Sequence, residues 1–106
     1  MENFTNLWSY QNEQIIKFQG SIISLSNFSA IRPIIIKNMG YEVPAIKFFG
    51  KKGIESQVFS YVDFPDFTGY SKEALDKSVE KLISEANTQC DSDIEWLWDN
   101  CFKGAK

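Results

Sequence analysis

The chain has 106 residues and a net charge of −3, with 43% apolar and 15% aromatic residues, enough for a single globular domain over residues 1–106. It contains no histidine, which excludes Ser-His and Cys-His catalysis and removes the commonest metal ligand, so we expect neither a metal site nor a cofactor. The sequence has no basic cluster and no long apolar run, so we expect a cytoplasmic protein that binds neither nucleic acid nor a membrane.

The N-terminal part contains one ambiguous segment and one predicted strand. In residues 1–12, Phe4, Leu7 and Trp8 have the spacing of a short amphipathic helix, and a strand is the alternative. Residues 14–26 alternate between polar and apolar as in a strand, and the apolar residues change face after Gly20. This change of face predicts a bulge or bend at Gly20, and residues 27–30 are typical of a turn.

Three further strands are predicted before residue 64. The run from Pro33 to Lys37 is apolar on both faces, which is typical of a strand in the middle of a sheet with proline as its first residue. Residues 42–49 and 54–63 have strand patterns as well. The turns between the three strands are predicted at residues 38–40 and 50–53, where Asn and Gly accept a positive φ.

The C-terminal part carries two helix signals. Ser71 can cap a helix that runs to about Asn87 along a clean apolar stripe. Ser92, followed three residues later by Glu95, forms a capping box and predicts the start of a second helix.

Together these elements predict an α+β fold, an antiparallel β-meander of about four strands packed by two C-terminal helices. The sheet-forming part covers about residues 1–63 and the helical part about residues 64–106. In the last strand we expect Ile54, Val58 and Val62 to face the helices, with Phe59 and Tyr61 on the opposite face.

Three motifs resemble sites of known chemistry, and none of them is favoured. Residues 50–53 have the G-x-x-G form of a nucleic-acid clamp, but strand-forming residues follow and favour a hairpin turn, with a helical period after residue 53 as the alternative. Asp91, Asp93 and Glu95 resemble the start of a calcium loop, which lacks its glycine and its final glutamate here. Cys90 and Cys101 are too far apart along a helix for a disulfide, so we expect a loop thiol and a core residue.

The aromatic residues exceed what one face of the sheet needs. An apolar patch that the helices leave uncovered is typical of a partner or ligand site. The alternatives are that residues 1–12 fold over this face, or that a homodimer covers it. The predicted ligand- or partner-binding residues are Phe48, Phe59, Tyr61, Phe64, Phe67, Tyr70 and Trp96.

These observations favour a non-catalytic interaction protein, a small acidic binder, adaptor or inhibitor of the kind carried on mobile elements. Its partner would be another protein or a second copy in a homodimer. A small-molecule binding module is the alternative, with an aromatic-lined pocket for a small apolar or cationic aromatic ligand.

An enzyme is a third hypothesis and would use polar groups near the aromatic segments: Arg32, Asp63 and Asp66. An acidic edge that suits a basic partner lies at the last predicted helix: Asp91, Asp93, Glu95 and Asp99.

Overall fold

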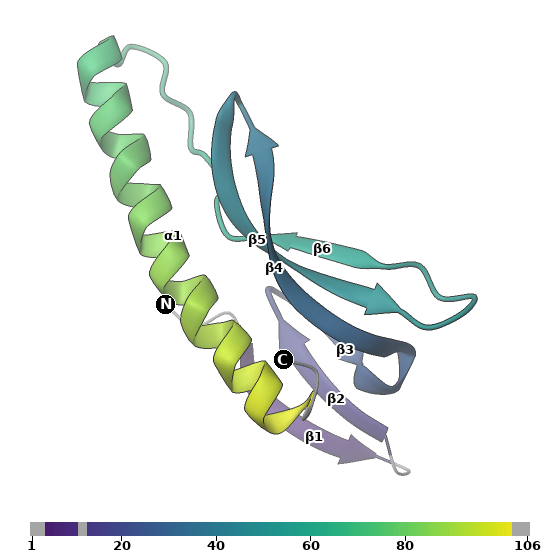
Figure 1. Cartoon of the computed structure of the whole chain (residues 1–106). Helices are drawn as coiled ribbons and strands as arrows, with labels where there is room; N and C mark the ends of the chain where they lie inside the picture. Colours follow the sequence, from purple (N-terminus) through teal and green to yellow (C-terminus); the bar gives the residue numbers. More distant parts are fainter. Residues whose placement is uncertain (1–3, 11–12, 103–106) are drawn as a thin grey trace.

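The computed structural model describes residues 4–10 and 13–102, and shows an α+β fold of antiparallel sheets and one long helix (Figure 1). Within these described residues, six strands form two three-stranded sheets, with the orders β1-β2-β3 and β4-β5-β6. The elements in chain order are β1 (Phe4–Tyr10), β2 (Glu13–Phe18), β3 (Ser21–Ser24), the short 3-10 helix η1 (Leu25–Asn27), β4 (Phe28–Asn38), β5 (Tyr41–Gly50), β6 (Gln57–Ser60) and α1 (Lys72–Asn100).

The first sheet settles both open points of the N-terminal part. The ambiguous segment is a strand, because β1 pairs antiparallel with β2. The bend predicted at Gly20 is a complete hairpin turn, in which Gln19 and Gly20 have φ of 48° and 80°. This turn joins β2 to β3 with Ile16 opposite Ile23, so the predicted single strand over residues 14–26 is two strands.

The second sheet is built on a long hairpin of β4 and β5. The two strands pair from Phe28 opposite Gly50 to Asn38 opposite Tyr41, and the turn predicted at residues 38–40 is confirmed. Met39 and Gly40 have φ of 51° and 83°, the pattern of a two-residue turn whose twist matches that of the strands.

The prediction of about four strands with β4 in the middle of a sheet was wrong. β4 begins at Phe28, where a turn was predicted, because η1 already reverses the chain over residues 25–27. β4 is also an edge strand, with β5 as its sole neighbour in the described part of the chain. Pro33 therefore lies inside a strand, which an edge tolerates because one side of it makes no ladder bonds.

The predicted faces of the last strand were wrong at Ile54 and Val58, whereas Val62 is buried beside Ala86 of α1 as predicted. β6 covers only Gln57–Ser60, and Ile54 and Val58 are 41% and 47% exposed. Register explains the inversion, because Phe59 pairs with the buried Ile46 whereas Val58 pairs with the charged Lys47. The face of β6 that meets the core is therefore set by β5.

The two predicted helices are one continuous helix, α1. Its predicted N-cap is confirmed, since Ser71 Oγ accepts a hydrogen bond of 3.2 Å from the Ala74 N–H. The predicted second start at Ser92 was wrong, because the chain before it has neither Gly nor Pro and continues the apolar stripe. The buried residues of α1 are Val79, Ala86, Cys90, Asp93, Ile94 and Leu97.

Two apolar clusters lie between the sheets and α1. The main core joins the first sheet, the second sheet and the C-terminal half of α1, and includes Phe18, Ile46 and Leu97. A smaller second core, formed by the buried residues Val43, Val62 and Ala86, lies nearer the tip of the β4-β5 hairpin. In the described part of the chain, no helix combines the length and the hydrophobicity needed to cross a membrane.

Candidate functional site

Four of the seven predicted binding residues lie in or against the main core. Phe48 is fully buried, and Phe59, Tyr61 and Trp96 are partly buried against the same cluster. The Phe48 and Phe59 rings meet edge to face with centroids 5.4 Å apart. This geometry stabilises the core, and it assigns Phe48 a place inside the protein.

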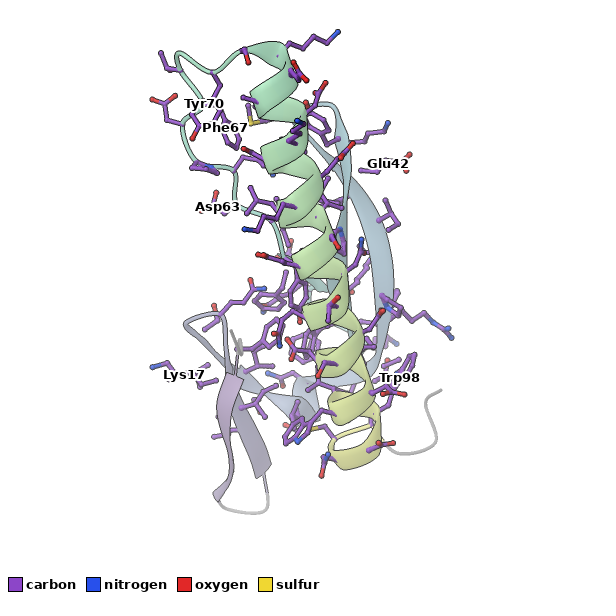
Figure 2. The ribbon with its side chains drawn as sticks, turned by 90° about the vertical axis from the view of Figure 1, so that its left-hand side faces the viewer. Lys17, Glu42, Asp63, Phe67, Tyr70 and Trp98 are labelled. Carbon is purple, nitrogen blue, oxygen red and sulfur yellow. The ribbon has the colours of Figure 1, made fainter. Side chains whose placement is uncertain are left out.

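The other three form a separate row of rings in the loop before α1. The ring centroid of Phe64 lies 5.7 Å from that of Tyr41 and 6.3 Å from that of Phe67. The Phe67 and Tyr70 ring centroids are 5.2 Å apart. Figure 2 shows Phe67 and Tyr70 beside the first turns of α1, while Trp98 lies towards its other end. The structure therefore separates the seven predicted residues into two groups.

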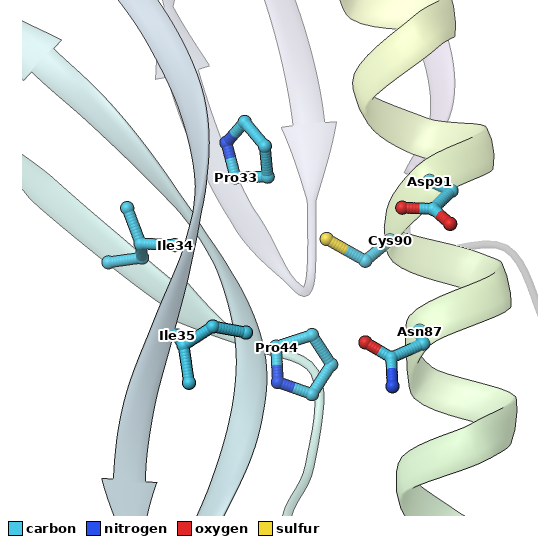
Figure 3. A pocket seen from close by; sticks show the side chains of 7 residues that line it. All are labelled: Pro33, Ile34, Ile35, Pro44, Asn87, Cys90 and Asp91. Carbon is cyan, nitrogen blue, oxygen red and sulfur yellow. The ribbon is translucent and has the colours of Figure 1, made fainter.

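An open pocket of about 360 Å³ lies elsewhere, between β4, β5 and the middle of α1 (Figure 3). Its volume is within the range of pockets that hold small ligands. None of the seven predicted aromatic residues lines it. The lining residues are Pro33, Ile34, Ile35, Pro44, Asn87, Cys90 and Asp91.

The inner end of the pocket is apolar, and the thiol there is protonated. Pro44 is buried, and Cys90 is 3% exposed with its Sγ 3.9 Å from the Ala45 carbonyl oxygen. Burial, followed by the charges of Asp91 and Asp93, raises the pKa of the Cys90 thiol to about 11. Cys90 is therefore a protonated thiol on a helix, and the prediction of a loop thiol was wrong.

The outer side of the pocket is the unpaired edge of β4. The Pro44 carbonyl accepts a hydrogen bond of 3.0 Å from the Tyr61 N–H, so it points away from β4. Pro44 and its partner Ile35 are therefore a non-hydrogen-bonded pair of the β4-β5 ladder. It follows that the N–H and C=O groups of Ile35 point to the free side of β4, next to the pocket.

A side chain of α1 caps this edge at one point. Trp98 Nε1 donates a hydrogen bond of 3.3 Å to the carbonyl of Ile31, which lies four residues before Ile35 and so on the same side of the strand. Pro33, between them, has no N–H to present. The open part of the edge is therefore short and begins at the pocket.

The charged residues around the pocket differ in how near they lie to it. Asp91 is the one charged residue among the lining residues, and it is exposed. Lys37, further along β4, lies 3.8 Å from Glu42 in an exposed ion pair. Arg32 alternates with Pro33 along the strand and so points to the opposite face of the sheet. The pocket consequently has a negative rim.

One member of the predicted acidic surface is a structural residue. Asp93 is 2% exposed and accepts hydrogen bonds from the Tyr61 hydroxyl at 2.6 Å and from Gln89 Nε2 at 2.8 Å. The exposed acids on this part of α1 include Asp91 and Glu95. Within the described residues, no group of three potential ligands could hold a metal ion.

Comparisons with protein-family models, with curated proteins and with solved structures each find no significant match to this chain. The candidate site therefore depends on geometry alone. The sequence patterns did not predict the pocket, because they placed residues 88–91 in a loop between two helices. The signal that could have found it is the pair Pro33 and Pro44, because two prolines in neighbouring strands imply positions without ladder bonds.

Proposed function

We propose that this protein is a non-catalytic interaction module that binds an extended segment of a partner protein along the free edge of β4. The observation that carries the proposal is the outward-pointing backbone of Ile35 beside the pocket. Strand addition of this kind takes its affinity from main-chain hydrogen bonds and its specificity from pockets that receive alternate side chains.

The surroundings of the edge suit a short bound segment. Trp98 occupies the edge at Ile31, and Pro33 lacks the donor that a longer added strand would need. Ile35 is 63% exposed, so an added strand would remove apolar surface from water as well as pair its backbone. These features favour a segment of a few residues over open-ended pairing with other edges.

The lining residues also favour binding over catalysis. Cys90 is the one thiol among the lining residues, and its pKa of about 11 keeps it protonated near neutral pH. The predicted aromatic-lined small-molecule pocket stays a prediction, because its residues do not line this pocket.

The test uses random short peptides displayed on phage and selected against the full chain, with selected peptides synthesised and their Kd values measured by fluorescence polarisation. Ile35→Pro removes the outward N–H and breaks no β4-β5 hydrogen bond, while Ile35→Val is the matched control that keeps it. We expect Ile35→Pro to weaken binding by about threefold to tenfold and Ile35→Val to change it little. Circular dichroism verifies that both variants fold.

Two outcomes would contradict the proposal. In the first, selected peptides bind Ile35→Pro as tightly as the unaltered chain. In the second, sedimentation shows a dimer that dissociates in Ile35→Pro and persists in Ile35→Val, so that a second copy occupies the edge. The second outcome would convert the predicted homodimer from a hypothesis into the explanation of this surface.

A further inference from the structure

We infer that the pocket and the free edge of β4 beside it select a segment with a lysine or arginine between two apolar residues. The cationic side chain of this segment would enter the pocket towards Asp91. This inference depends on the proposed function and adds the chemistry of the partner. It is carried by the composition of the pocket, by the charges around it and by the alternation of side chains along an added strand.

The pocket matches the two halves of a long cationic side chain. In Figure 3, the Pro33 and Pro44 rings project towards α1, and Cys90 Sγ points from α1 towards the strands. These groups offer apolar contacts to an aliphatic stem, as Lys and Arg use when they keep only the charged end in water. Asn87 and Asp91 lie one helical turn apart, and each provides a side-chain oxygen for the charged end.

The charges nearby leave Asp91 available. Within the described residues, Asp91 has no cationic partner at ion-pair distance, and Glu42 already pairs with Lys37. Arg32 extends from the other face of the sheet. A cation in the pocket would therefore gain the attraction of Asp91, with no other cation among the lining residues.

The residues on either side of the cation face different surroundings. Successive side chains of an added strand point to opposite faces, so the neighbours of the cation would lie beside Ile34 and Ile36. Both of these isoleucines are half-buried. Apolar, preferably β-branched, side chains form favourable cross-strand pairs with them, which gives the alternation apolar–cation–apolar.

The test repeats the peptide selection on three proteins. Asp91→Lys reverses the charge at the rim of the pocket. Glu85→Lys is the matched control, because Glu85 is exposed and lies about 200° around the helix from Asn87. We expect the unaltered chain and Glu85→Lys to select Lys or Arg between apolar residues, and Asp91→Lys to select Asp or Glu at that position. In a selected peptide, replacing the lysine by norleucine should weaken binding by about threefold to tenfold.

The results separate this inference from the function on which it depends. Peptides that lose affinity for Ile35→Pro but show no cation, or keep their cation against Asp91→Lys, would overturn the inference and leave the proposed function intact. Peptides whose affinity is insensitive to Ile35→Pro would overturn both. A charge preference that changes equally in Glu85→Lys would also overturn the inference, because it would reflect net charge rather than Asp91.

Discussion

The two halves of α1 are held very differently. The C-terminal half contributes Cys90, Ile94 and Leu97 to the main core, where both sheets converge. The N-terminal half meets the tip of the β4-β5 hairpin, where the second core has few fully buried members. A single uninterrupted helix therefore joins a well-packed end to a sparsely packed end, and the pocket lies near the boundary between them.

Two Tyr–Asp hydrogen bonds show the same difference. At the well-packed end the Tyr61 hydroxyl donates to Asp93 at 2.6 Å, and at the sparse end the Tyr41 hydroxyl donates to Asp76 at 3.4 Å. Both link the second sheet region to α1. The shorter bond satisfies a buried carboxylate, whereas the longer one lies close to the geometric limit of a hydrogen bond.

The largest effect on the free energy of unfolding should come from truncating a leucine in each half of α1. Leu97 is fully buried, so Leu97→Ala leaves a cavity and should lower the free energy of unfolding by about 3 kcal/mol. Leu82 is only partly buried, and Leu82→Ala should lower it by about 1 kcal/mol. Urea unfolding followed by circular dichroism measures both. Equal losses would contradict the contrast between the two halves.

The next effect concerns the two hydroxyl groups. Tyr61→Phe removes one of two donors from the buried Asp93 and should lower the free energy of unfolding by about 1–3 kcal/mol. Tyr41→Phe, at the longer bond, should lower it by about 0.5 kcal/mol or less. The same urea experiment applies, and a larger loss for Tyr41→Phe would refute the ranking.

A smaller, stabilising effect is expected in the hairpin turns. Met39 has a φ of 51°, which Asn accepts more easily, so Met39→Asn should raise the free energy of unfolding by about 0.5–1 kcal/mol. Gln19 has a similar φ of 48°, but its Nε2 also donates to the Ser60 carbonyl at 3.0 Å. Gln19→Asn should therefore gain less, and thermal unfolding of both variants would detect the difference.

The smallest effect is a pH dependence of stability caused by the two thiols, of which Cys90 is buried and Cys101 half-buried. Burial raises the pKa of both Cys90 and Cys101 from 9.0 to about 11, so the fold favours the protonated thiols. Their contribution to stability is complete below the unfolded pKa and is lost as pH rises through the folded pKa. The thermal midpoint of the unaltered chain should fall more between about pH 8 and about pH 10.5 than that of Cys90→Ala/Cys101→Ala. A parallel decline would contradict the raised pKa values.

The sequence pattern correctly predicted two local features, the N-cap at Ser71 and the turn at residues 38–40. A helix cap and a tight turn each depend on a few adjacent residues, so the local sequence is enough to indicate them. The capping box at Ser92 and Glu95 is an equally local signal, but the packing of Cys90 and Ile94 against the main core favours a continuous helix.

The remaining features depend on contacts between distant residues. Phe59 faces the core because it pairs with Ile46 on β5, a register that no pattern within β6 specifies. The candidate pocket is lined by Ile35 on β4 and by Asp91 on α1, two elements that lie far apart in the sequence. Its backbone donor and acceptor, moreover, are invisible in a side-chain pattern and follow only from the pairing of Ile35 with Pro44.

Amide hydrogen exchange at β4, measured residue by residue by NMR, would show whether the outer edge of this strand is free to bind. In the free protein, we expect slow exchange at Ile34 and Ile36, whose N–H groups face β5, and fast exchange at Ile35 between them. Adding a selected peptide should make the Ile35 amide slow. An Ile35 amide that is already protected in the free chain, or that stays fast with the peptide bound, would contradict a binding edge at β4.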